Sequence, residues 1–160
     1  MMMDKQISKL KELLGAKNKN KSHSELRNKI LLFESENNLL VPKDLVEYFL
    51  LLENAIHELD KDLFQFYPFN QFISVEKGLA HWGGLPDYRT IVATLEQCEN
   101  CFVFADYMSH LFAYAIRLYR NTADFNEVYL ICGDKYKIIA NSFSGFLELY
   151  LNDSIELKTI

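Results

Sequence analysis

The cysteines are the residues whose spacing most directly suggests chemistry. Cys98 and Cys101 form a C-x-x-C pair, and Cys132 is the remaining cysteine. A structural zinc site needs four ligands, usually two such pairs, and none of the four histidines has ligand spacing to them. A thioredoxin-like redox pair precedes a helix, whereas Cys101 opens an apolar strand pattern. We therefore predict two small buried side chains at a strand entrance, with no metal and no other cofactor.

Two segments between residues 57 and 62 match metal motifs only in part. His57-Glu58-Leu59-Asp60 lacks the second histidine of a helical metalloprotease motif. Asp60-Lys61-Asp62 lacks the glycine and the glutamate of a calcium-binding loop, because Gln65 and Gln71 stand at those places. We predict a turn here.

Nucleophile and phosphate-binding motifs are absent from the sequence. It contains no G-x-G-x-x-G, no G-K-S/T phosphate loop and no G-x-S-x-G. Ser109-His110 is the nearest serine–histidine pair, and a hydrolase would need the fold to bring an acid to it. The sequence therefore predicts that the chain is not an enzyme.

The loop His81-Trp82-Gly83-Gly84 holds the single tryptophan of the chain. A tryptophan beside two glycines is either an exposed anchor for a partner or a lid folded back over the core. The residue pattern leaves both alternatives open.

Charge is divided unevenly along the chain. Residues 1–30 hold eight basic and three acidic side chains, a net +5, whereas residues 31–160 hold nine basic and nineteen acidic ones, a net −10. An acidic body repels nucleic acid and favours a protein partner with a basic surface, although solubility alone also accounts for acidic patches. The basic segment 16–21 lacks the aromatic residues typical of nucleic-acid binding. Charge density and loop position select these candidate partner-binding residues: Glu53, Glu58, Asp60, Asp62 and Trp82.

Length and composition set the broad class. A chain of 160 residues with 49% hydrophobic and 24% charged residues is typical of one globular domain, predicted over residues 1–160. No apolar run approaches the ~20 residues of a membrane helix, and the N-terminus lacks a signal peptide's apolar core. An odd number of cysteines fits a reducing compartment. We therefore expect a cytoplasmic protein that does not bind membranes.

Apolar spacing predicts three helices in the first third of the chain. Residues 4–14 carry an apolar stripe that ends at Gly15, and Ser22-His23-Ser24-Glu25 has the pattern of a capping box. The helix after this box ends near Asn37-Asn38. Pro42 suits the first turn of a third helix, which has Leu45, Tyr48, Phe49 and Leu52 on one face.

The remainder of the chain predicts an antiparallel sheet followed by one more helix. Strand patterns occupy residues 63–67, 101–105, 111–119, 127–132 and 135–140, and Gly133-Asp134 is a hairpin signal. Gly83-Gly84-Leu85-Pro86 predicts a turn, and residues 88–97 fit either a short helix or an extended connection. Ser142 is a suitable N-cap for a final helix with Phe143, Phe146 and Leu147 on one face. The order predicts an α+β domain with helices packed on a meander.

Three segments carry a combined pattern: Phe33-Glu34 followed by residues 40–49 (LVPKDLVEYF), then residues 102–107 with 114–116, and then residues 128–133 with 139–146. In this order they resemble the opening, the central strands and the closing unit of the SUKH superfamily of Smi/Knr-type proteins. The resemblance covers residues 24–153, after an N-terminal helix and basic loop in 1–23. It departs at Asn54-Ala55, where the family usually has Asn-Gly.

The resemblance implies an α+β fold with N-terminal helices on a mainly antiparallel sheet, and no catalytic site. Bacterial members are similar to immunity proteins that bind and neutralise toxins in the cytosol, many of which are nucleases with basic clefts. Fungal members regulate cell-wall glucan synthesis and act as interaction hubs. We therefore expect a protein-binding domain of the immunity type, with a regulatory or scaffold protein of cell-wall synthesis as the alternative.

Overall fold

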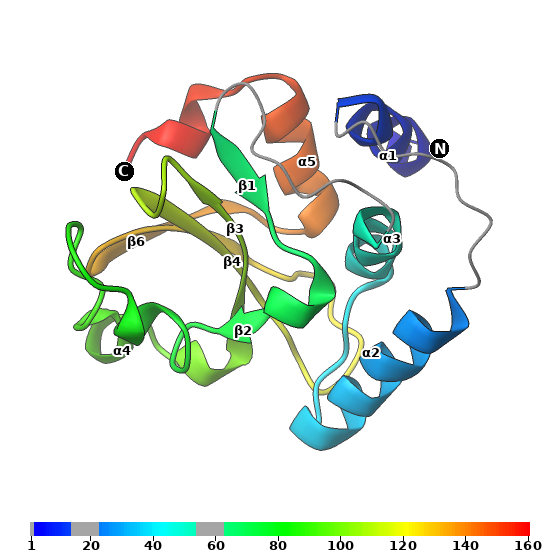
Figure 1. Ribbon diagram of the computed structural model, residues 1–160, viewed down its shortest axis with the longest axis horizontal. Coiled ribbons are helices and arrows are strands. Elements are labelled where there is room, and N and C mark those ends of the chain that lie inside the picture. The colour runs from blue at the N-terminus through cyan, green and yellow to red at the C-terminus, as the bar shows by residue number, and fades with distance from the viewer. Residues whose placement is uncertain (1, 14–22, 54–62) are drawn as a thin grey trace.

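A six-stranded antiparallel sheet lies at the centre of the computed structural model, which describes residues 2–13, 23–53 and 63–160 (Figure 1). Strands β3 to β6 follow one another as a meander, whereas β1 and β2 both pair with β3 on the side away from β4. The strands are β1 (Phe64–Phe66), β2 (Ile73–Ser74), β3 (Cys101–Tyr107), β4 (Phe112–Arg117), β5 (Val128–Cys132) and β6 (Lys135–Ala140).

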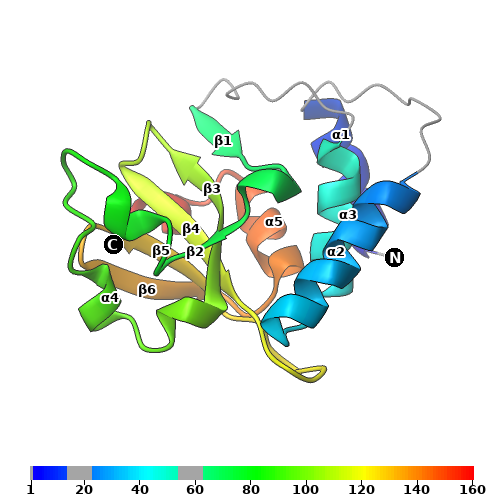
Figure 2. The ribbon, with the colours of Figure 1, turned by 60° about the horizontal axis from the view of Figure 1, so that its bottom comes forward.

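Helices of about ten residues or more gather on one face of the sheet, and the short turns of residues 75–98 cover the other (Figure 2). Helices α1, α3 and α5 contact one another, and α2 lies beside α3. The helices are α1 (Met2–Leu13), α2 (Ser24–Asn37), α3 (Lys43–Leu52), α4 (Ile91–Thr94) and α5 (Phe143–Leu151), and the 3-10 turns are Phe69–Gln71, Leu79–His81, Cys98–Asn100 and Ile155–Lys158. The arrangement confirms the predicted α+β class with a C-terminal helix.

Strand β3 separates two hydrophobic cores. Phe102 and Phe104 point into the core under the helices, whereas Cys101 and Val103 point into a smaller core under the segment 75–98. Because successive side chains of a strand face opposite ways, a strand that is buried on both faces reads as a continuous apolar run. A break in register between Val103 and Ala105 returns Ala105 to the helical side.

Several predicted turns and caps are confirmed. Helix α2 ends at Asn38, whose φ of 53° is the left-handed conformation of a helix C-cap. Gly133, with φ 64°, makes the hairpin between β5 and β6, and a Cβ there would lie 3.2 Å from the Asp87 carbonyl oxygen. The Ser142 hydroxyl accepts the main-chain N–H of Gly145 at 3.0 Å, as expected of an N-cap.

The start of two helices differs from the prediction. His23 is the N-cap of α2 and makes no side-chain capping bond, and Ser22, the first residue of the predicted capping box, lies outside the described residues. Pro42 precedes α3 as its N-cap instead of standing in the first turn, because its ψ of 150° is extended. In the undecided segment 88–97 the structure has the one-turn helix α4.

Candidate functional site

The structure places two of the five predicted partner-binding residues, and it does not bring them together. Glu53 follows the last turn of α3, and its carboxylate lies 2.9 Å from Nδ1 of His23 at the start of α2. Trp82 packs against the smaller core, on the other face of the sheet. Glu58, Asp60 and Asp62 lie outside the described residues, as do His57-Glu58-Leu59-Asp60, Asp60-Lys61-Asp62 and Asn54-Ala55.

Trp82 is half-buried and folds back over the smaller core. Its ring stacks on the His110 ring at 3.5 Å between centroids with an interplanar angle of 13°, and it meets the edge of Tyr88 at 5.3 Å. This position matches the lid alternative of the sequence analysis. In the same loop, Leu85 is the residue that projects, with 96% of its surface exposed.

A buried carboxylate lies beneath this stack. Asp106 accepts a hydrogen bond from the Tyr67 hydroxyl at 2.5 Å, and Nε2 of His110 lies 3.7 Å from the same carboxylate oxygen. Burial, reinforced by the hydrogen bond to Asp106, raises the pKa of Tyr67, so the phenol remains a donor. Ser109 is exposed on the β3–β4 turn, and among the described residues no hydrogen bond joins it to His110. The turn therefore shows no activated nucleophile.

Cys98 and Cys101 are buried free thiols at the entrance to β3, where the sequence analysis expected small buried side chains. Burial raises the pKa of the Cys101 thiol to about 12. Within residues 2–13, 23–53 and 63–160, no group of three or more His, Cys, Asp or Glu side chains is placed to hold a metal ion.

The candidate site is a row of neighbouring hollows, two between α2 and the segment 68–77 and one at the end of the sheet. We call it the α2 groove, and it consists of three hollows. The first, of about 270 Å³, lies between the start of α2, the end of α3 and residues 68–71. The second, of about 450 Å³, lies between the end of α2, residues 72–77 and the turn before β3. The third, of about 440 Å³, shares Asn37, Leu39 and Asn100 with the second.

Aromatic rings form the floor of the α2 groove. Phe33, half-buried on α2, contacts Phe69 between the first two hollows, with ring centroids 5.7 Å apart. It also contacts Phe72 at 5.8 Å and Phe102 at 5.2 Å, both of which line the second hollow. The floor is therefore apolar and packed from both α2 and the sheet, which makes it a firm surface for a ligand.

The rim of the second hollow is acidic. Glu36, Glu76 and Glu99 line it with one cation, Lys77, and within the part of the chain that the structure describes none of these carboxylates has an ion-pair partner. In the first hollow, by contrast, Glu53 is held by His23. Three carboxylates and one lysine leave the lining of this hollow with a net negative charge, which a bound cation would neutralise.

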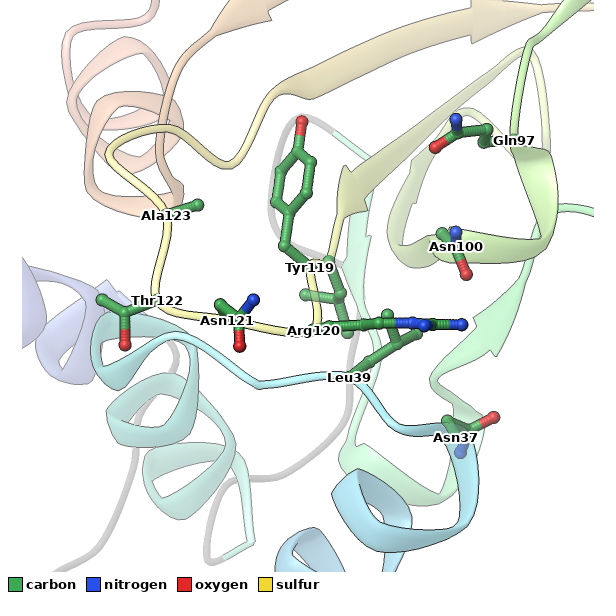
Figure 3. Close-up of a pocket in the computed structure, with 10 residues that line it drawn as sticks. Asn37, Leu39, Gln97, Asn100, Tyr119, Arg120, Asn121, Thr122 and Ala123 are labelled. Carbon is green, nitrogen blue, oxygen red and sulfur yellow. The ribbon is translucent and has the colours of Figure 1, made fainter.

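The third hollow has different chemistry (Figure 3). Its lining is rich in amide side chains, from Asn37, Gln97, Asn100 and Asn121, and Arg120 extends from the 119–123 segment toward the side formed by Asn37 and Asn100. The α2 groove thus changes from an acidic centre to an end that carries a guanidinium.

Comparison of the chain with protein-family models, with curated proteins and with solved structures finds no match. The similarity to the SUKH superfamily therefore stays a prediction. No helix among the described residues is long and apolar enough to cross a membrane.

Proposed function

We propose that this chain is a non-enzymatic protein-binding domain of the immunity type, which binds a cognate toxin with a basic surface in the cytoplasm and neutralises it. The observation that carries the proposal is the second hollow, where three carboxylates face one lysine above an aromatic floor. Protein interfaces combine apolar anchors at the centre with charges that select the partner.

The charge balance of the whole chain supports the same partner. Residues 31–160 carry a net charge of −10, and a field of this sign attracts a basic protein and speeds its association. A toxin that cleaves nucleic acid needs a basic cleft to hold phosphates. An acidic surface is complementary to such a cleft and would block it. The resemblance to immunity proteins points to the same role.

Affinity capture of the full chain from its native cells, followed by mass spectrometry, tests the proposal. We expect one protein with a basic surface at a one-to-one ratio, and an association rate that falls steeply as salt rises from 50 to 300 mM. Glu76→Lys in the second hollow should slow association, whereas Glu148→Lys on α5 makes the same change in net charge and lies outside the α2 groove.

Two results would contradict the proposal. One is an association rate that responds neither to salt nor to these substitutions. The other is a changed cell envelope after deletion of the gene in cells that hold no toxin, because that phenotype belongs to the regulatory alternative.

A further inference from the structure

We infer that the α2 groove binds an extended basic segment of the partner protein, with an arginine or lysine head in the second hollow and an apolar side chain in the first. The inference rests on the proposed function and goes further, because it names the surface and the chemistry of the segment that occupies it.

The carboxylates around the second hollow indicate that the bound head group is cationic. Glu36 belongs to α2, Glu76 to the turn after β2 and Glu99 to the turn before β3, so three separate parts of the chain place a carboxylate around one hollow. Lys77 supplies the single opposing charge. The rim is therefore left with two more negative than positive groups, and a cationic side chain is the complement of that charge.

The aromatic floor of the second hollow suits the aliphatic part of a bound arginine or lysine side chain. Arginine and lysine carry three or four methylenes between the main chain and the charge, and these bury well against apolar surface. Phe33, Phe72 and Phe102 offer that surface below the rim. A guanidinium over an aromatic face gains a further attraction, so arginine should be preferred to lysine.

The lining of the first hollow fits an apolar side chain instead. Leu26, Phe49, Pro68 and Phe69 line it. Its two charged residues, Lys29 and Glu53, have opposite signs. No net charge is left there for a ligand to neutralise.

The spacing of the two hollows sets the register of the segment. The α2 residues of the first hollow, Leu26 and Lys29, precede those of the second, Phe33, Glu36 and Asn37, by about eight positions. At ~1.5 Å per helical residue this separates the hollows by roughly 12 Å. An extended chain covers roughly that distance in four residues, and residues four apart face the same side. Arg120 lies past the second hollow and repels a further cation.

Labelled peptides provide the direct test. The probe is a fluorescein-labelled nonapeptide of serine and threonine, with leucine at its third position and arginine at its seventh. Two matched probes carry glutamine in place of the arginine or serine in place of the leucine. We expect fluorescence anisotropy at 50 mM salt to show that either replacement weakens binding at least fivefold.

Two triple variants of the full chain separate the α2 groove from general charge. The groove variant is Glu36→Gln, Glu76→Gln and Glu99→Gln. The control is Glu12→Gln, Asp134→Asn and Glu148→Gln, which removes the same charge at exposed positions outside the three hollows. We expect the groove variant to bind the arginine peptide about tenfold more weakly, and the control less than twofold. Because the three glutamates are exposed and have no ion-pair partner among the described residues, the groove variant should melt within a few degrees of the wild type, which shows that it is folded.

Equal losses in the two variants, or no binding of the arginine peptide at millimolar concentration, would overturn the inference. The proposed function has its own separate outcome. A protein captured one-to-one by the wild type and equally by the groove variant leaves protein binding in place and removes the α2 groove as its site. Capture of no protein by any form would count against the proposed function itself.

Discussion

Asp44 joins the starts of two helices that are a hundred residues apart in the chain. One oxygen of its carboxylate accepts both the main-chain N–H and the hydroxyl of Ser144, at 2.9 Å each, in the first turn of α5. The other oxygen accepts the N–H of Leu45 in the first turn of α3. First-turn N–H groups have no partner within their own helix, so a single side chain satisfies donors of two helices. Replacing it should therefore loosen the packing of α3 on α5.

The expected loss of unfolding free energy can be estimated from these hydrogen bonds. A hydrogen bond to a charged group contributes about 1.5–3 kcal/mol, and a carboxylate at a helix N-terminus adds about 0.3–1 kcal/mol. The two bonds to Ser144 share one oxygen of a half-buried side chain. We therefore expect Asp44→Ala to lower the free energy of unfolding by about 2–3 kcal/mol. For a chain of this length that corresponds to a fall in Tm of roughly 4–12 °C.

Urea titrations of the wild type and of variants at Asp44 and Ser144 measure this loss. Asp44→Asn keeps an acceptor and should cost about half as much as Asp44→Ala. A double-mutant cycle with Ser144→Ala should give a coupling energy of about 0.5–1.5 kcal/mol. The reasoning is refuted if Asp44→Ala costs under about 0.5 kcal/mol, or if the two substitutions add within about 0.3 kcal/mol.

Three further outcomes are expected. Tyr48→Phe should cost about 1–2 kcal/mol in a urea titration, because the buried hydroxyl lies 3.1 Å from two main-chain carbonyl oxygens and one of them is left without its donor. Cys101 of the native protein at pH 8 should react with iodoacetamide at least a hundredfold more slowly than in urea, because burial raises its pKa from an ordinary 9.0 to about 12 and so depletes the reactive thiolate. Equal rates by peptide mass spectrometry would contradict this. Gly133→Ala should cost about 1–2 kcal/mol, since φ is positive and the new Cβ would press on Asp87, whereas Gly83→Ala, with open space around it, should leave Tm unchanged.

The longer helices and strands could be predicted from the sequence because their signals are local, whereas β2 was not predicted and α4 lies in a segment that the sequence left open. The apolar stripe of α5 and the hairpin glycine each lie within about ten neighbouring residues, and burial follows the same period. The residues that resemble the SUKH opening have local structural roles too. Glu34 accepts the N–H of Val41 at 2.8 Å and so closes the turn from α2 toward α3.

The α2 groove could not be predicted, because it depends on pairing between distant segments. Strand β2 has two residues, too few to show a period, yet its pairing of Ser74 with Phe102 brings the turn holding Glu76 beside the turn holding Glu99. The excess of phenylalanine was the available signal for the floor, but it does not say which rings meet. The position of Trp82 likewise follows from the β3–β4 turn, whose three left-handed residues, 108–110, place His110 beneath it.

Two glutamates of α2 show how the fold uses some carboxylates and leaves others for binding. Glu34 bonds to the main chain of Val41, whereas Glu36, two positions later, faces the second hollow without an ion-pair partner among the described residues. Glu34→Ala should therefore lower the free energy of unfolding by about 1–2 kcal/mol, and Glu36→Ala should leave it within about 0.5 kcal/mol or raise it. For binding of the arginine peptide we expect the reverse order, in which Glu36→Ala causes the larger loss of affinity. If urea titrations gave both variants the same loss, the carboxylates of the rim would be part of what holds the fold together, and they would not be left free to bind a cation.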